Sequence, residues 1–305
     1  MYYILMDLEW NDAYCKKVGG FVNEIVEIGA VKLDKGFNEI DRFSIIVRSA
    51  ITNRLSTRFR ELTGMTNEQM KDGTPFGEAW AMYKSWAGDD AITLTWSNSD
   101  LHTLYHNCVN FIGEPKAAEI GKYVDLQKYF QYELSLKGKN EKNQISLSNA
   151  AILFEIDFES ETLHHALDDS CIAAAILRKC YVKEHFENFI VDTSRDDFYK
   201  RMMYKVRYIS DINDPAINKE QLIFSCPKCK KQAKRVSVWR PGKPWLNASF
   251  LCNNCDYKFK AAIALKKFYD RVEVKKKVFE SSKKGSGNRK YNAQEKNKKP
   301  VLKTK

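Results

Sequence analysis

The segment YYILMDLEW, from Tyr2 to Trp10, is the stretch that decides the fold of this 305-residue chain. Its apolar residues predict a β-strand, and side chains two positions apart on a strand project from the same face. Asp7 and Glu9 are therefore expected side by side. Neighbouring carboxylates repel each other, and a divalent cation held by oxygen ligands compensates that repulsion. We treat the pair as a candidate metal site; the alternative is an exposed strand end with two solvated acids.

The net charge of +11 is unevenly distributed along the chain. Residues 1–220 carry 26 Lys and Arg against 34 Asp and Glu, whereas residues 221–305 carry 24 against 5. A basic C-terminal third is typical of proteins that bind a polyanion, and nucleic acid is favoured over an anionic membrane because no strongly apolar face accompanies the charges. The sequence shows neither a signal segment nor a run of about 20 apolar residues, so we expect a cytoplasmic protein without membrane contact.

The hydrophobic pattern beyond the first strand predicts a mixed sheet with helices. Strands are expected over residues 21–33 and 43–47, after a loop over residues 12–20. Further strands and helices then alternate, with a strand over residues 91–96 and helices over residues 76–86, 101–111 and 163–180. Such an order predicts an α/β fold in which helices flank a mixed sheet.

Composition divides the chain into four predicted parts. The regular pattern ends near residue 185, and two Cys-x-x-Cys pairs mark a second, smaller module. A helix reaching about residue 280 is expected beyond that module, and the strongly basic sequence after it is too polar to pack. We therefore predict the following parts: a first, α/β domain over residues 1–185, a linker over residues 186–220, a cysteine module over residues 221–262 and a basic, largely disordered tail over residues 263–305.

Three more residues fall where such folds collect functional side chains, at strand ends and helix starts. Asp100 stands between a predicted strand and a predicted helix. His164 and Asp169 both lie on the helix expected over residues 163–180. Five positions correspond to about 140° around a helix, so the two side chains can flank one site without stacking.

At these residues the chain resembles a known family, the DEDDh (DnaQ-like) 3′–5′ exonucleases of the ribonuclease H-like fold. The resemblance covers roughly residues 1–180. It rests on these motifs: D-L-E at 7–9, N-E-I-V-E-I-G-A-V at 23–31, L-T-G-M-T at 62–66, W-S-N-S-D-L at 96–101 and H-H-A-L-D-D at 164–169.

The resemblance implies a two-metal site and a reaction. Asp7, Glu9, Asp100 and Asp169 would hold two Mg²⁺ or Mn²⁺ ions, and His164 would deprotonate the attacking water. An imidazole, with an ordinary pKa of about 6.5, suits that role near neutral pH. The implied reaction is hydrolysis of phosphodiester bonds at the 3′ ends of single-stranded nucleic acid, which releases nucleoside 5′-monophosphates. The domain is most similar to Eri-type enzymes, so RNA is favoured; the alternatives are a DNA 3′-exonuclease and a nucleic-acid-binding regulatory factor.

Several neighbouring residues have weaker assignments. The resemblance implies that Leu8, Trp10 and Met65 contact the terminal nucleotide, and ordinary core packing is the alternative for all three. His165 and Asp168 are expected to face away from the site, because adjacent residues on a helix point in different directions. A further histidine pair, His102 and His106, has helical spacing but lacks a third metal ligand.

The second module is defined by Cys226, Cys229, Cys252 and Cys255. The two Cys-x-x-Cys pairs are 22 residues apart and enclose a β-rich segment, which resembles a zinc ribbon with one structural Zn²⁺ in a closed Cys₄ site. A module this small is expected to take its folding energy from the metal.

Basic and aromatic side chains alternate in this module, as in surfaces that bind single-stranded nucleic acid. Zinc ribbons also dock proteins, and the sequence names no protein partner. The residues in question are Lys228, Lys230, Lys231, Lys234, Arg235, Trp239, Arg240, Lys243, Trp245 and Tyr257.

Overall fold

The computed structural model describes residues 1–139, 143–157 and 164–279. It divides into two compact units, Met1–Met203 and Tyr204–Lys305, and each is described by itself. No helix within the described ranges has both the length and the apolar character needed to cross a membrane.

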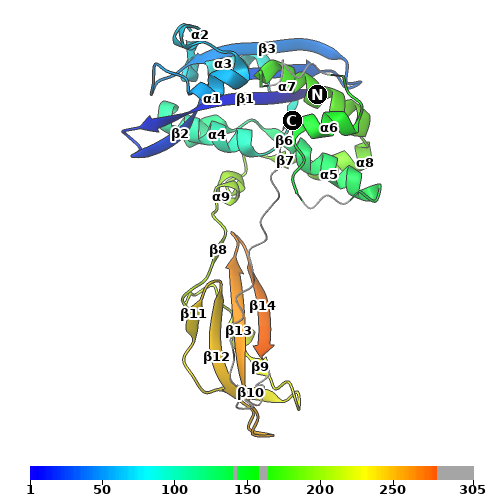
Figure 1. The fold of residues 1–305 in the computed structure, drawn as a ribbon. Coiled ribbons are helices and arrows are strands. Elements are labelled where there is room, and N and C mark those ends of the chain that lie inside the picture. Colours follow the sequence, from blue (N-terminus) through cyan, green and yellow to red (C-terminus); the bar gives the residue numbers. More distant parts are fainter. Residues whose placement is uncertain (140–142, 158–163, 280–305) are drawn as a thin grey trace, which may run out of the picture. The chain divides into compact units, whose positions relative to one another are not determined.

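The first unit contains a central sheet and the helices around it (Figure 1). Its strands are β1 (Tyr2–Cys15), β2 (Gly20–Leu33), β3 (Glu39–Arg48), β4 (Thr74–Pro75), β5 (Ala91–Thr95), β6 (Lys122–Asp125) and β7 (Val191–Asp192). Its α-helices are α1 (Thr57–Thr63), α2 (Asn67–Lys71), α3 (Phe76–Ala87), α4 (Ser99–Asn107), α5 (Leu126–Leu136), α6 (Leu147–Leu153), α7 (Ala166–Cys180), α8 (Lys183–Phe186) and α9 (Phe198–Met202). Shorter helical turns are η1 (Cys108–Ile112), η2 (Pro115–Ala118) and η3 (Glu187–Phe189).

The sheet has the strand order β4-β3-β2-β1-β5-β6-β7. Strands β1, β2 and β3 form an antiparallel meander, and β5 and β6 lie parallel to β1. This mixed order, with the first strand at the centre, is the ribonuclease H-like fold and confirms the predicted fold class.

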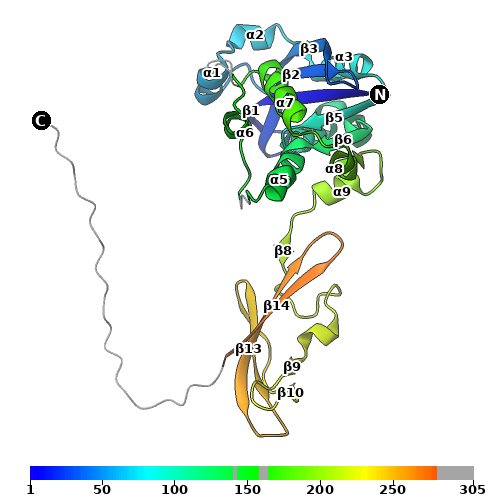
Figure 2. The same ribbon diagram turned by 90° about the vertical axis from the view of Figure 1, so that its right-hand side faces the viewer.

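Strand β1 separates two hydrophobic cores because its side chains alternate between the faces of the sheet. Tyr3 and Leu5 pack with helices α5, α6 and α7, whereas Ile4, Met6 and Leu8 pack with α3 and α4. Helix α7 contacts β1 and β2 directly, and both views show it against these strands (Figures 1 and 2). Asp7 and Glu9 therefore lie on the same face of the sheet as Tyr3 and Leu5, the face that α7 covers.

The hairpin between β1 and β2 is longer than the sequence pattern indicates. The prediction of a loop over residues 12–20 is wrong, because β1 continues to Cys15 and β2 begins at Gly20. Cross-strand pairing extends the ladder: Tyr14 pairs with Phe21, and their rings are 5.6 Å apart between centroids. The register shifts once, between Glu9 and Trp10.

The segment after residue 185 is not simply a linker. Strand β7 pairs with β6, and Phe198, Tyr199 and Met202 pack against the core on the α3 and α4 face. Their aromatic and apolar side chains explain the difference from the prediction, because burial against the core stabilises a segment whose periodicity is weak. Residues 186–203 consequently belong to the first unit.

The second unit is a β-structure with its own core. Its elements are β8 (Arg207–Tyr208), η4 (Lys219–Leu222), β9 (Phe224–Ser225), β10 (Gln232–Arg235), β11 (Arg240–Gly242), β12 (Trp245–Leu251), β13 (Lys258–Lys267) and β14 (Val272–Phe279). The strand order is β14-β13-β12-β10-β9, with β11 paired to β12 and β8 paired to β13. Phe250, Phe259, Ile263 and Leu265 are among its buried residues.

The helix predicted to end near residue 280 is also wrong. Residues 258–267 and 272–279 form the antiparallel pair β13 and β14. Val272 and Val274 alternate with charged residues at period two, and alternating β-branched side chains favour a strand. The remainder of the predicted disordered tail, residues 280–305, lies outside the described residues.

Candidate active site and metal-binding residues

The first two candidate ligands come from the middle of β1. Asp7 pairs with Gly29 of β2, and Glu9 pairs with Glu27. Both β1 acids alternate with Met6 and Leu8, so they project toward α7 rather than toward α3 and α4. The register shift immediately after Glu9 is a β-bulge, a feature that commonly re-aims side chains beside active sites.

Asp100 reaches the same region from the start of α4. The chain leaves β5 at Thr95, and Asp100 lies in the first turn of the following helix. Its side chain is buried, and Oδ1 accepts a hydrogen bond of 3.2 Å from the backbone N–H of Leu8. Because Leu8 lies between the two β1 acids, this bond fixes Asp100 next to them.

Asp169 is positioned by close contact between α7 and β2. A Cβ built on Gly29 would lie 2.2 Å from the backbone carbon of Ala166, so only glycine permits the observed approach. Ser170 strengthens the contact, since its Oγ donates to the carbonyl oxygens of Gly29 (3.1 Å) and Ala166 (2.8 Å). Gly29 is the residue opposite Asp7, and the first turn of α7 therefore lies over the β1 acids.

His164 lies near the other candidate ligands, but its backbone conformation differs from the prediction. Helix α7 begins at Ala166 with His165 as its N-cap, so His164 precedes the helix, and the predicted Leu163 lies outside the described residues. His164 has φ = 74°, a left-handed conformation that cannot continue a right-handed helix. The prediction that it shares the helix with Asp169 is therefore wrong. Nevertheless, ligand atoms of Glu9, His164 and Asp169 all lie within 4.8 Å of one another.

The acids in this site perturb one another. Burial raises the pKa of Asp7 well above its ordinary value, and the charges of Asp100, Glu9, Asp169 and Glu27 raise it further. Burial and the same kind of repulsion raise the pKa of Glu9 to about 8. Burial likewise raises the pKa of Asp100 to about 7 and that of Asp169 to about 6. Clustered carboxylates with raised pKa values are typical of sites built to hold cations.

The residues present fit divalent cations. Asp169 Oδ1 and Glu27 Oε2 are buried atoms without a hydrogen-bond partner among the described residues. Buried polar atoms are normally paired, so an oxygen in this state requires another partner such as an ion. The donor set consists of carboxylate oxygens with one imidazole, and hard ions such as Mg²⁺ and Mn²⁺ prefer oxygen ligands.

Glu27 is the site residue that sequence reasoning missed. It is 6% exposed, its charge raises the pKa values of Asp7 and Glu9, and its Oε2 lies 4.0 Å from Nδ1 of His165. A signal was present in the sequence, because an acid within the apolar run of N-E-I-V-E-I-G-A-V is costly to bury without a function.

The side chains of the predicted nucleotide contacts lie in or beside hydrophobic cores. Leu8 and Met65 are buried in hydrophobic cores, and Trp10 packs at the edge of the core shared by α3 and α4. Their assignment as nucleotide contacts stays a prediction. Rings of His102 and His106 lie 4.7 Å apart, and no third metal-ligating side chain joins them in the part of the chain that the structure describes.

A second cluster of ligands lies in the second unit, where the four predicted cysteines come together. The Sγ atoms of Cys226 and Cys255 are 3.6 Å apart, and those of Cys229 and Cys252 are 3.4 Å apart. These separations exceed the roughly 2.05 Å of a disulfide and are close to the roughly 3.8 Å between thiolates around one tetrahedral ion.

The two Cys-x-x-Cys segments have the same local structure. In each, the N–H of the first cysteine donates to the carbonyl five residues later, Lys231 in one and Tyr257 in the other. The residue after the second cysteine, Lys230 or Asp256, has positive φ in both. A hydrogen bond from the Lys231 backbone lowers the pKa of the Cys229 thiol to about 6, which favours the thiolate that a metal binds.

The ribonuclease H-like fold, with carboxylates gathered on its central strand, defines a hydrolase of the nuclease class. The sequence profile of the RNase T exonuclease family matches residues 15–177, more than half of the chain. The chain therefore belongs to this exonuclease family. No curated protein matches it.

Solved structures similar to this chain include the following three. Cell-death related nuclease 4 is 18% identical, with a TM-score of 0.49 over 58% of this chain and 62% of that one. A 3′-exonuclease solved in recognition of a histone mRNA stem-loop is 22% identical, with a TM-score of 0.46 over 58% and 80%. Exonuclease I of E. coli with single-stranded DNA and zinc is 14% identical, with a TM-score of 0.47 over 81% and 54%. This chain thus spans about three fifths of the length of cell-death related nuclease 4.

Proposed function

We propose that this chain is a metal-dependent 3′–5′ exonuclease that hydrolyses phosphodiester bonds at the 3′ ends of single-stranded nucleic acid. RNA is the favoured substrate, and the products are nucleoside 5′-monophosphates. The observation that carries the proposal is the convergence of Asp7, Glu9, Asp100, His164 and Asp169, from three separate segments, around the middle of the central strand.

Each residue has a role that follows from its position. The four carboxylates would hold two divalent cations, which when bound supply positive charge to the phosphate and lower the pKa of water. His164 would take a proton from the attacking water and return it to solvent, a role supported by its exposure beside Glu9 and Asp169. The bond broken joins phosphorus to the 3′ oxygen of the preceding nucleotide, which leaves the phosphate on the released product.

The direct test is degradation of end-labelled single strands with Mg²⁺ or Mn²⁺. We expect loss of 3′ label at the first turnover, stepwise shortening of 5′-labelled strands, and no shortening without a divalent cation. Asp169→Asn should reduce the rate by at least about 100-fold, since removal of groups that stabilise charge in the transition state costs 10²–10³ in kcat.

Asp168→Asn is the matched control, because Asp168 is the adjacent acid on the same helix turn. Its rate should stay within about threefold of wild type. Equal rates for the two variants, or release of 5′ nucleotides first, would reject the proposed reaction.

The preference for RNA is supported by the resemblance of the motifs to Eri-type enzymes. The test compares the release rate of the 3′-terminal nucleotide from two strands of one sequence, one ending in a ribonucleotide and the other in a deoxyribonucleotide. The two substrates then differ only in the terminal 2′-hydroxyl. Faster release of the ribonucleotide is the expected result, and faster release of the deoxyribonucleotide would assign the chain to DNA.

For the second unit, we propose that the four cysteines hold one structural Zn²⁺. The matched local structure of the two Cys-x-x-Cys segments supports this site. Four cysteine ligands fill a tetrahedral site and leave no open position for a substrate. Metal analysis should find one zinc per chain, which Cys229→Ser should lose and Cys15→Ser, in the first unit, should retain. Full zinc content in Cys229→Ser would contradict this site.

A further inference from the structure

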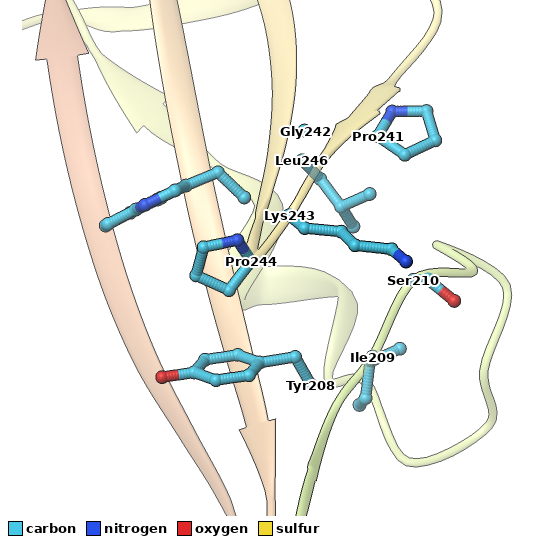
Figure 3. A pocket seen from close by; sticks show the side chains of 9 residues that line it. Tyr208, Ile209, Ser210, Pro241, Gly242, Lys243, Pro244 and Leu246 are labelled. Atoms are coloured by element: carbon cyan, nitrogen blue, oxygen red, sulfur yellow. The ribbon is translucent and has the colours of Figure 1, made fainter.

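A pocket of about 250 Å³ lies in the second unit, apart from the cysteine cluster. It is formed where β8 approaches the turn between β11 and β12. In Figure 3, the side chains of Lys243 and Pro244 lie above those of Tyr208 and Ile209. The volume is below the 300–1,000 Å³ of pockets that bury drug-sized ligands, which suits a single planar ring system.

The walls of this pocket are aromatic and apolar. Tyr208, Trp245 and Pro244 line it, and none of its nine lining residues is acidic. Tyr208 is 46% exposed, and no ring or cation contact to it occurs within the described residues. A large aromatic ring with an uncovered face on a polar surface is a platform for stacking, because every nucleobase offers a π-face.

Lysines surround the aromatic residues. Lys243 lines the pocket, and the ammonium of Lys277 lies 4.4 Å from the ring centroid of Trp245. Lys266 pairs directly with Tyr208 across β8 and β13, which places both side chains on one face. None of these three lysines forms a salt bridge with a described residue. Lys266 lies over the ring of Phe268, and Lys277 lies over that of Trp245. Lysines without a carboxylate partner beside an apolar pocket favour a ligand that combines a ring with negative charge.

The wider charge of the unit points to the same ligand. Residues 204–279 carry 18 Lys and Arg against 6 Asp and Glu. One of those acids, Asp214, is already paired with Arg207 (3.3 Å) and Lys267 (3.5 Å). A unit with this net positive charge attracts the phosphates of a strand, and neutralising them supplies sequence-independent affinity.

We propose that this pocket binds an unpaired nucleobase of a single-stranded nucleic acid, with the base stacked on Tyr208 and the flanking phosphates held by Lys243 and its neighbouring lysines. The inference rests on the proposed function in taking that strand as the substrate of the first unit. It adds a base-stacking site, which requires Tyr208, a residue outside the predicted cysteine module.

The test measures binding without hydrolysis. Anisotropy of 5′-labelled single-stranded RNA and DNA of one sequence is followed with the full chain, in buffer without Mg²⁺ or Mn²⁺ and without chelator. Tyr208→Ala should weaken binding about 5- to 100-fold, the range found for loss of one base–aromatic stack. Tyr269→Ala, which removes an exposed tyrosine outside the pocket, should stay within about twofold of wild type.

Two further arms separate stacking from charge. Strands with abasic positions keep their phosphates, so they should bind wild type more weakly and Tyr208→Ala with no additional loss. Lys243→Gln should reduce the slope of log K against log salt by about 0.7, whereas Tyr208→Ala should leave that slope unchanged. Lys219→Gln, an exposed lysine outside the lining, serves as a second control.

Equal affinities for Tyr208→Ala and Tyr269→Ala would overturn the inference, and so would equal wild-type affinity for natural and abasic strands. A proline-rich peptide that needs Tyr208, with oligonucleotide binding unchanged in the variant, would assign the pocket to protein recognition instead. If Tyr208→Ala fails to fold, the abasic strands with wild type and the Lys243→Gln slope still decide the question. A chain that stacks bases here but shortens no strand would retain this inference and reject the exonuclease proposal.

Discussion

Glu27 faces Glu9 across the pairing of β1 and β2, and it adds negative charge to a site that already concentrates carboxylates. Its Oε2 has no hydrogen-bond partner among the described residues, and His165 is 4.0 Å away. We expect Glu27→Gln to weaken Mn²⁺ binding about 10- to 100-fold, the effect typical of residues that support metal ligands. Titration calorimetry with Mn²⁺ measures this change.

The control for that variant is Glu24→Gln on the same strand. Glu24 is also buried, but its carboxylate accepts hydrogen bonds from the Ser49 hydroxyl and from the backbone N–H of Ala50 and Ile51. Its loss should lower the melting temperature while leaving Mn²⁺ affinity unchanged. Weaker Mn²⁺ binding in Glu24→Gln but not in Glu27→Gln would show that the site does not depend on Glu27.

The raised pKa values of the acids predict how stability depends on pH without metal. Burial and repulsion place the pKa of Glu9 near 8 and that of Asp100 near 7, above the roughly 4 of these groups in an unfolded chain. The folded state therefore binds more protons between pH 4 and 8, and the free energy of unfolding falls as pH rises through this interval. In EDTA, the melting temperature of the first unit should decrease from pH 5 to pH 8.

Asp7→Asn, compared under the same conditions, should show a shallower decrease and melt several degrees higher at pH 8, because one negative charge is removed from the site. An identical slope in the variant would contradict this account.

At the scale of elements, regular alternation made the sheet predictable. Residues 2–6 form an apolar run, and residues 6–10 then alternate apolar and acidic side chains, so the sequence predicts both the strand and the common face of Asp7 and Glu9. The start of α7 was not predictable in the same way, because helical spacing in H-H-A-L-D-D continues through His164, whose positive φ depends on tertiary contacts. Strands β13 and β14 were missed because the lysines of this segment weaken the apolar signal. Pairing of β13 with both β12 and β14 stabilises an alternation that is modest by itself.

The contact between β2 and α7 carries a prediction of its own. In Gly29→Ala the new Cβ would meet backbone atoms of Ala166 and Leu167 at 2.2 Å, so α7 must move away from the sheet. We expect a loss of about 1–3 kcal/mol in the free energy of unfolding, typical of overpacking, and a drop of about 100-fold in kcat, because a displacement near 1 Å misplaces Asp169. Gly20→Ala at the start of the same strand is the control, since nothing lies within 4 Å of its added Cβ. Denaturant unfolding and steady-state rates measure both, and full activity in Gly29→Ala would disprove the positioning role of this contact.

At the scale of the whole molecule, the two units carry opposite charge. Residues 1–203 hold 23 Lys and Arg against 31 Asp and Glu, whereas residues 204–279 hold 18 against 6. The boundary itself was not readable from the sequence pattern, because residues 186–203 mix charged and aromatic residues without a clear period and owe their place in the first unit to a few aromatic and apolar contacts. An acidic catalytic unit repels a polyanion, so the basic unit is expected to supply much of the attraction for the substrate.

A chain that ends at Met203 tests this division of roles, since it keeps β7, α9 and the core contacts of the first unit intact. We expect its KM for a single strand to be at least about tenfold higher than that of the full chain at 50 mM salt, with kcat within about threefold. The two KM values should converge as salt increases, because phosphate contacts made by the basic unit weaken with ionic strength. Circular dichroism of the shortened chain verifies that the first unit is folded. Equal KM values at low salt would show that the first unit recruits its substrate alone, whereas loss of kcat with unchanged KM would place the second unit in the chemical step.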